Sequence, residues 1–293
     1  MEVYGTGRRA LVLGGGGAFG AVQAAYVAAA AEAGFRPDVV VGTSVGALNA
    51  AWVAMHPGDA TGLLDIWQTL DGRKVLDLRL GAMLRRLARR PLSIASNTLV
   101  LELVERYVHP RSFAQTSLPL AVTATNLSRG CKQVFRTGAL ADAILASTAV
   151  PGLFAPVEIG GELFVDGSLV AATDLATALE MGATEILAID LTPASVMPRP
   201  RTALGVLRRS VAIAGSAATA AMEDCLRLQM PVHIVRPDLS QLSAWRVATT
   251  REAVAGYLEM ARRALSGVID ARGYLTSSPA SVGELGRRPA LLA

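Results

Sequence analysis

The feature that most restricts the fold of this chain is a pair of long uncharged runs, residues 10–31 and 39–58, each interrupted by glycine. Both runs exceed the roughly 18 apolar residues that predict a membrane-spanning helix, and 52% of the chain is hydrophobic. In each run, however, a short apolar stretch leads directly into a glycine-containing turn, which would leave backbone amides unpaired in lipid. We therefore interpret each run as a buried strand, a turn and a helix.

The N-terminal region also resembles a targeting signal, because Arg8 and Arg9 precede an apolar stretch. That stretch ends at the first glycines after residues 10–13, so it is too short for the apolar region of a secretory or twin-arginine signal. We expect no signal peptide and no transmembrane helix. The expected location is the cytoplasm, with peripheral contact at an anionic membrane surface compatible with the positive charge.

Composition narrows the classes of partner. The formal net charge is +4, but the chain has neither a long basic tail nor a basic patch interleaved with aromatic residues, so nucleic-acid binding is not expected. The two cysteines, Cys131 and Cys225, lack metal-ligand spacing, and no cluster of His, Cys, Asp and Glu has it either. We expect reduced thiols, no metal and no cofactor.

Short apolar runs alternate with helical patterns along the chain, which predicts an α/β fold with a mainly parallel sheet. The expected strands cover residues 9–13, 39–41, 118–125, 162–165, 185–190 and 232–235, and the longer expected helices cover 18–33, 202–229 and 246–271. With no internal repeat or linker, residues 1–276 are expected to form a single domain. The Pro, Ser and Gly-rich residues 277–293 are expected to form a flexible tail.

The first glycine motif, residues 15–20, reads Gly-Gly-Gly-Ala-Phe-Gly between a predicted strand and a helix. It satisfies the G-x-G-x-x-G pattern of dinucleotide-binding proteins, which also needs an acidic residue at the end of the second strand. That strand instead ends in residues 42–44, Gly-Thr-Ser, and Asp38 precedes it. A nucleotide cofactor is therefore not expected.

The second glycine motif, residues 42–46, reads Gly-Thr-Ser-Val-Gly and also joins a strand to a helix. This G-x-S-x-G arrangement is typical of a nucleophile elbow, in which Gly42 and Gly46 permit a sharp turn that exposes Ser44. Acyl transfer also needs backbone N–H donors for the oxyanion. The bare amides of residues 14–17 suit that role.

The residues alone do not identify the base that would activate Ser44. His56 lies about three helical turns from Ser44, and His109 precedes a proline in a loop. His233 lies within a strand-like pattern, where packing is the commoner role, yet Ser44, Asp190 and His233 follow the chain order of one known triad type. Asp166 ends a predicted strand, although Asp followed by Gly is more often a hairpin turn.

Taken in order, residues 15–20, 42–46 and 166–168 resemble the three motifs of the patatin-like phospholipase family, and residues 146–154 and 182–185 resemble its connecting segments. The likeness extends from about residue 8 to residue 240. It implies a three-layer α/β/α fold with a mainly parallel sheet, a patatin-like variant of the α/β-hydrolase architecture. It also implies hydrolysis of carboxylic esters of phospholipids or lysophospholipids without a histidine.

Residue by residue, the resemblance makes Ser44 the nucleophile and Asp166 its base, supported by Gly167. It assigns the oxyanion hole to the backbone amides of Gly15, Gly16 and Gly17.

Three positions depart from the family pattern. Phe19 stands where Arg or Lys is usual, Ser168 stands where Gly or Ala is usual, and residues 171–174 replace an Asn-Asn-x-Pro segment. Thr173 is expected to cap the helix that follows. These departures keep two alternatives open: a carboxylesterase or thioesterase with a Ser44–Asp190–His233 triad, and a catalytically silent lipid-binding module.

Residues 80–90 form an amphipathic helical pattern, with leucines and Met83 on one face and four arginines largely around the other. Such a segment is either an interfacial helix or lid on anionic lipid, or a helix packed on the core with a solvated arginine face. The sequence predicts no particular oligomeric state.

Overall fold

The computed structural model describes residues 7–69, 98–108, 112–192, 199–227, 229–240, 242 and 248–276. The amphipathic segment 80–90, His109 and the expected tail 277–293 lie outside these ranges.

The described residues form one mainly parallel sheet of eight strands in the order β5-β6-β3-β2-β1-β7-β8, with β4 also paired to β3. The strands are β1 (Arg9–Leu13), β2 (Val39–Thr43), β3 (Leu120–Asn126), β4 (Cys131–Phe135), β5 (Val157–Ile159), β6 (Glu162–Asp166), β7 (Glu185–Ile189) and β8 (Val232–Val235). Strands β3, β2, β1, β7 and β8 pair in parallel, whereas β4, β5 and β6 join by antiparallel pairing.

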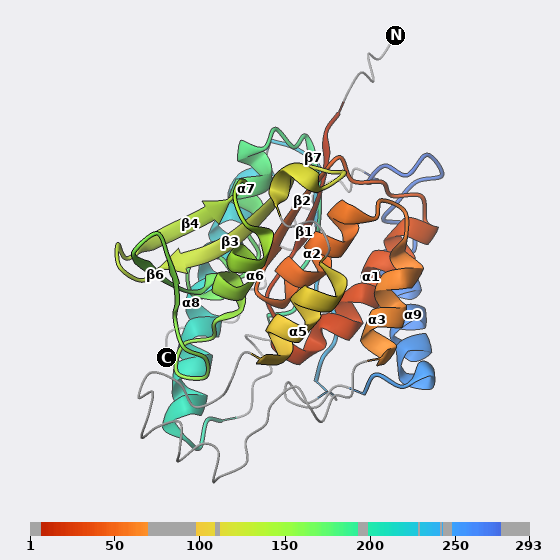
Figure 1. Ribbon diagram of the computed structural model, residues 1–293. Coiled ribbons are helices and arrows are strands. Elements are labelled where there is room, and N and C mark those ends of the chain that lie inside the picture. Colours follow the sequence, from red (N-terminus) through yellow and green to blue (C-terminus); the bar gives the residue numbers. More distant parts are fainter. Residues whose placement is uncertain are drawn as a thin grey trace, which may run out of the picture.

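Helices cover both faces of the sheet, so the fold has three layers, α/β/α (Figure 1). The α-helices are α1 (Gly20–Glu32), α2 (Val45–Met55), α3 (Ala60–Thr69), α5 (Thr98–Tyr107), α6 (Leu140–Thr148), α7 (Leu175–Glu180), α8 (Ala203–Leu226) and α9 (Arg251–Leu265). Short 3₁₀ turns are η1 (Gly17–Phe19), η2 (Phe113–Gln115) and η3 (Gly167–Leu169). This architecture confirms the predicted fold class.

Strand β1 shows how the layers are held together. Leu11 and Leu13 pack in the core with α1, α2, α3 and α9, whereas Ala10 and Val12 pack in a second core with α7 and the end of α8. Successive side chains of a strand point to opposite faces, so a strand covered on both faces is apolar at every position. This is why no alternation of polar and apolar residues is visible in the sequence of β1.

Both uncharged runs form a strand, a turn and a helix, as predicted. Residues 10–31 contribute to β1, η1 and α1, and residues 39–58 contribute to β2 and α2. Helix α1 is buried from Gly20 to Ala30 and lies against α3 and α9, which explains its alanine-rich composition. Within the described ranges, no helix is both long and apolar enough to cross a lipid bilayer.

Candidate active site

Strand β3 brings the ends of two other strands together. Thr43, the last residue of β2, pairs with Thr123, and Asp166, the last residue of β6, pairs with the next residue, Ala124. Strand β4 pairs with both Thr123 and Ala124, so it occupies the opposite edge of β3 there. Strands β2 and β6 therefore share one edge. Because β2 runs parallel and β6 antiparallel to β3, their carboxyl ends meet, and Ser44 lies beside Asp166.

Ser44 is held in a strained turn at the start of α2. Its φ of 55° makes it the one non-glycine residue with positive φ among those described, a conformation that costs roughly 1–3 kcal/mol. Its N–H donates to the Ser147 hydroxyl oxygen at 2.8 Å, and that hydroxyl donates to the Thr123 carbonyl at 2.7 Å. These two hydrogen bonds connect the turn to helix α6 and strand β3 and stabilise it.

The two glycines of the elbow are needed because the backbone is crowded there. A Cβ at Gly42 would lie 2.5 Å from the Gly46 carbonyl oxygen, and a Cβ at Gly46 would overlap the carbonyl oxygen of Leu13. Because neither glycine carries a Cβ, α2 can start directly against β1 and β2. The G-x-S-x-G pattern therefore reflects close packing of the helix on the sheet, as expected for a nucleophile elbow.

Ser44 and Asp166 form a direct hydrogen bond, in which the Ser44 Oγ donates to Asp166 Oδ2 at 2.6 Å. Both residues are buried, with 5% and 2% of their surface exposed. The Ser168 N–H donates to the other carboxylate oxygen at 2.8 Å and fixes its orientation. Burial raises the pKa of Asp166, and the hydrogen bonds from Ser44 and Ser168 act in the opposite direction.

Gly167 allows this carboxylate to approach β3. A Cβ at Gly167 would overlap the carbonyl oxygen of Thr123. The Asp166 N–H also donates to the Ala149 carbonyl at 2.9 Å. Asp166 and Gly167 therefore end a strand and begin the 3₁₀ turn η3, instead of forming the hairpin turn that Asp-Gly commonly makes.

The glycine block after β1 runs past Ser44. A Cβ at Gly15 would lie 3.2 Å from the Ser44 Cβ and would overlap the Ser168 hydroxyl. Of the three glycines expected to donate to an oxyanion, Gly15 already donates within the fold, to the Ala172 carbonyl at 2.8 Å. Among the described residues, no acceptor forms a hydrogen bond with the N–H of Gly16 or Gly17.

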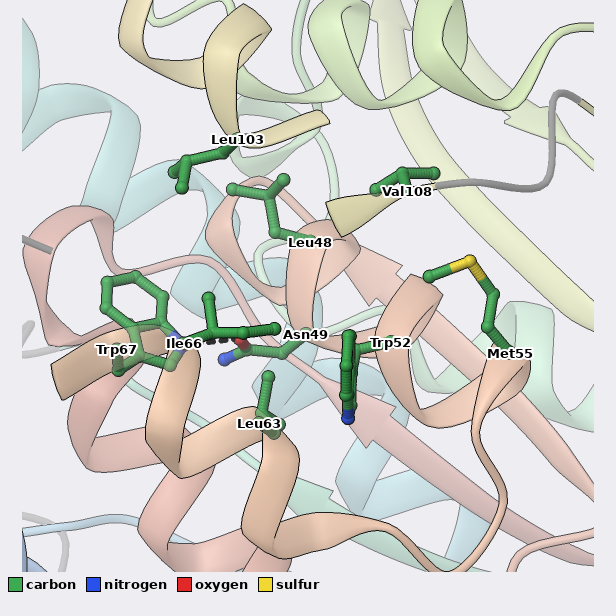
Figure 2. A pocket seen from close by; sticks show the side chains of 9 residues that line it. All are labelled: Leu48, Asn49, Trp52, Met55, Leu63, Ile66, Trp67, Leu103 and Val108. Carbon is green, nitrogen blue, oxygen red and sulfur yellow. Dashed lines mark hydrogen bonds between the residues drawn. The ribbon is translucent and has the colours of Figure 1, made fainter. Parts of the chain in front are cut away.

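A buried polar network missed by the sequence analysis supports this block. Gln23 Nε2 donates to the Gly14 carbonyl at 3.0 Å, and Gln23 Oε1 accepts from Asn49 Nδ2 at 2.9 Å. Asn49 Oδ1 accepts from Trp67 Nε1 at 2.9 Å (Figure 2). One feature of the sequence could have predicted this network: Gln23 and Asn49 are isolated amide side chains within otherwise apolar helices.

The alternative base His233 lies far from Ser44. It pairs with Leu187 inside β8, which is three strands from β2, or about 14 Å at ~4.8 Å per strand. Its proposed partner Asp190 instead accepts from Arg236 Nε at 3.2 Å and from the Thr192 N–H at 2.9 Å. A Ser44–Asp190–His233 triad is therefore not assembled.

The other described histidine, His56, also lies away from the serine. It follows the last turn of α2, and its ring contacts that of Trp52 at a tilt of 40°, with ring centroids 4.1 Å apart.

Two departures from the family pattern acquire a structural account. Phe19 is 3% exposed and packs into the larger core, so an aromatic ring fills the position where a charged residue is usual. The cap of α7 is Asp174, which accepts from the Thr177 N–H at 3.1 Å, so the expected capping by Thr173 is wrong. Asp174 also accepts from Lys132 Nζ at 3.1 Å, and this ion pair compensates its burial.

The described residues include no group of three or more His, Cys, Asp or Glu side chains that could hold a metal ion.

Comparison with known proteins identifies the family. The family model described as patatin-like phospholipase matches residues 11–179, more than half of the chain. An uncharacterised NTE-family protein of Mycobacterium bovis is 30% identical over 191 residues, which are 65% of this chain and 51% of that protein. The lysophospholipase NTE1 of Cryptococcus neoformans is 28% identical over 186 residues, 62% of this chain and 11% of that protein.

The similarity thus spans about half the length, or less, of these curated relatives. Among solved structures, the crystal structure of VipD from Legionella pneumophila is similar with a TM-score of 0.50 and 15% identity, covering 89% of this chain and 66% of that one. At this identity the likeness concerns the fold alone. Together with the family model, it supports a patatin-type α/β/α fold, and the chain belongs to the patatin-like phospholipase family.

Proposed function

We propose that this protein is a serine lipid acyl hydrolase that cleaves carboxylic esters of phospholipids or lysophospholipids. The observation that carries the proposal is the 2.6 Å hydrogen bond from Ser44 Oγ to Asp166 Oδ2. A serine hydroxyl bonded to a buried carboxylate can lose its proton as it attacks an ester. The names of the relatives support the class of substrate, since they include a lysophospholipase and a mouse patatin-like phospholipase domain-containing protein.

In the proposed reaction, Ser44 Oγ forms a bond to the ester carbonyl carbon while its proton passes to Asp166 Oδ2. The tetrahedral intermediate collapses when the bond to the leaving alkoxide breaks, and Asp166 returns the proton to that oxygen. Water then attacks the acyl-enzyme with Asp166 as base, and Ser44 recovers its proton as the fatty acid departs.

The negative oxygen of the tetrahedral intermediate requires donors beside Ser44. We assign this role to the backbone N–H groups of Gly16 and Gly17, since the amide of Gly15 is used by Ala172. The first turn of α2 adds the positive end of a helix dipole at the serine. Together these groups supply the fixed dipoles that stabilise developing charge.

Burial makes the aspartate a better base for this purpose. A solvated carboxylate has a pKa near 4 and accepts a proton weakly at neutral pH. The desolvation of Asp166 raises its pKa, which brings it closer to the working pH. The hydrogen bond from the Ser168 N–H keeps the second oxygen occupied, so Oδ2 faces the serine.

The proposal is tested by covalent labelling and by turnover on a panel of phospholipids and lysophospholipids. A fluorophosphonate should label the wild type at Ser44 and should not label Ser44→Ala. The matched control is Ser210→Ala, which removes an exposed serine hydroxyl from α8 and should leave labelling unchanged. A folded wild type that neither takes the label nor releases fatty acid would refute the proposal and favour a silent lipid-binding module.

A further inference from the structure

The side chain of Ser168 lies beside both members of the Ser44–Asp166 pair, although the proposed reaction uses only its backbone. Ser168 follows Asp166 by two residues, within the 3₁₀ turn η3. A Cβ placed at Gly15 would overlap the Ser168 hydroxyl and would lie 3.2 Å from the Ser44 Cβ. The Ser168 hydroxyl therefore borders the same small space as the nucleophile. It also stands at one of the positions where the chain departs from the family pattern, which has Gly or Ala there.

The position of this hydroxyl is fixed from several sides. The Ser168 N–H donates to Asp166 Oδ1 at 2.8 Å, and the Val170 N–H closes the turn by donating to the Gly167 carbonyl at 3.1 Å. Helix α8 packs so closely against η3 that a Cβ at Gly215 would overlap the Ser168 carbonyl oxygen. Ser168 therefore cannot move away from the carboxylate without disturbing the turn or the helix.

Among the described residues, the groups that act on the Asp166 carboxylate are uncharged. Burial raises the pKa of Asp166, and hydrogen bonds from the Ser44 hydroxyl, the Ser168 N–H and the Ser168 hydroxyl lower it. The elements packed around it also present uncharged groups: Thr125 of β3 donates to the Asp166 carbonyl at 2.9 Å, Ser147 of α6 accepts from the backbone of the nucleophile, and α8 meets η3 at a glycine. Hydrogen-bond donors, with no positive charge, therefore favour the ionised form of this buried carboxylate.

We propose that Ser168 is a positioning residue whose hydroxyl keeps Asp166 ionised at lower pH and so extends the reaction toward acid conditions. The inference rests on the proposed function and adds a determinant of its pH range. A hydrogen bond to a charged acceptor is stronger than one to a neutral acceptor, so the hydroxyl stabilises the carboxylate more than the protonated acid. Loss of the hydroxyl should therefore raise the pKa of Asp166 and leave the ionised form competent as a base.

A direct test follows the titration of Asp166 and requires no turnover. In protein labelled with ¹³C at the aspartate carboxyl groups, the Asp166 resonance is assigned by its absence from Asp166→Asn. Its midpoint should lie at higher pH in Ser168→Ala than in the wild type, because alanine retains the N–H donor and lacks only the hydroxyl. Ser168→Gly should shift the midpoint in the same direction. An unchanged midpoint in both variants would overturn the inference.

The variant Ser216→Ala is the matched control. Ser216 lies on α8 directly after Gly215, and among the described residues its buried Oγ has no hydrogen-bond partner. This substitution also removes one serine hydroxyl, and it should leave the Asp166 midpoint as in the wild type. Melting temperatures establish that each variant is folded. An equal shift in Ser216→Ala and Ser168→Ala would assign the shift to altered packing of α8 and would overturn the inference.

The rate of fluorophosphonate labelling connects this titration to the reaction. Well below the wild-type midpoint, Ser168→Ala should label about tenfold more slowly than the wild type, the effect of weakening one hydrogen bond to a charged group. Well above the midpoint, the two proteins should label at similar rates. A rate lowered equally at every pH would overturn the inference. A wild type in which Asp166 titrates as expected, but which neither takes the label nor hydrolyses any ester, would instead count against the proposed function.

Discussion

At the scale of single residues, Asp166 combines two properties that oppose each other. Its carboxylate accepts hydrogen bonds from Ser44 and Ser168, which favour the charged form, yet its burial disfavours that form more strongly and raises its pKa. A group in this state is a stronger base than an exposed aspartate and is costly to keep ionised in the fold. Activity and stability should therefore respond to Asp166 in opposite ways.

The pH dependence of the reaction should reveal the raised pKa. In the proposed reaction only ionised Asp166 can take the proton from Ser44, so kcat/KM should fall as the pH is lowered through this pKa. The fall should occur at a higher pH than the ordinary carboxyl value of about 4. The measurement is the rate of fluorophosphonate labelling as a function of pH. A rate that stays constant down to the ordinary carboxyl range would contradict the assignment of Asp166 as base.

The variant Asp166→Asn should lose activity without losing stability. Since the pKa is higher in the folded chain than in the unfolded chain, ionisation lowers the free energy of unfolding as pH rises from the unfolded pKa through the raised one. Above the raised pKa this cost is fully present, and a neutral amide removes it. We expect kcat to fall by about 10³-fold or more, with a melting temperature equal to or above that of the wild type by calorimetry.

At the scale of elements, the glycine block, α1, α2 and α3 are connected by the amide network of Gln23 and Asn49. Gln23 is fully buried and bonds the carbonyls of Gly14 and Ile189 as well as Asn49. The network therefore joins the loop beside Ser44 to helices α1, α2 and α3. Polar groups in this position are stabilising only while all partners remain paired.

Replacing Gln23 by methionine should break this connection with little change in volume. The lost hydrogen bonds and the unpaired Gly14 carbonyl should lower the free energy of unfolding by about 2–3 kcal/mol, measured by urea denaturation. Gln229→Met is the control, because Gln229 is exposed, and its effect should stay within about 0.5 kcal/mol. Equal effects of the two substitutions would show that the network adds no stability.

The elements and the serine could be predicted because their signals are local. The turn containing Ser44 is specified by residues 42–46, and the end of β6 at Asp166 follows from the strand pattern before it. The proposed backbone donors to the oxyanion were not predictable in full, because the N–H of Gly15 is paired with the carbonyl of Ala172, far away in the chain. The α7 cap was misassigned because Thr173 and Asp174 are adjacent residues that can both cap a helix.

At the scale of the whole molecule, α1 is the central helix of one layer. It lies against α3 and α9, and Ala25 of α1 is fully buried in the larger core. The exposed contact between α1 and α9 is the ion pair of Glu32 with Arg262, in which Arg262 Nε lies 2.7 Å from the carboxylate. Close packing of small side chains should therefore contribute more to the assembly of this layer than the ion pair does.

This difference can be measured with two substitutions. Ala25→Leu adds bulk at a fully buried position of the larger core and should destabilise the fold by about 1–3 kcal/mol. Arg262→Gln removes an ion pair between half-exposed groups and should change the free energy of unfolding less than Ala25→Leu does. Both values come from denaturant titrations. A larger effect for Arg262→Gln would show that charge pairing, not packing, holds the layer together.

The meeting of β2 and β6 on one edge of β3 has a consequence for protein engineering. Ser44 and Asp166 are 122 positions apart, and the exposed β3–β4 turn at residues 127–130 separates them in the chain. A cut in this turn would leave each fragment with one half of the dyad, so neither fragment alone could hydrolyse an ester. On the proposed function, recovered hydrolysis on mixing would report reassociation of the sheet, and the protein would serve as its own split reporter.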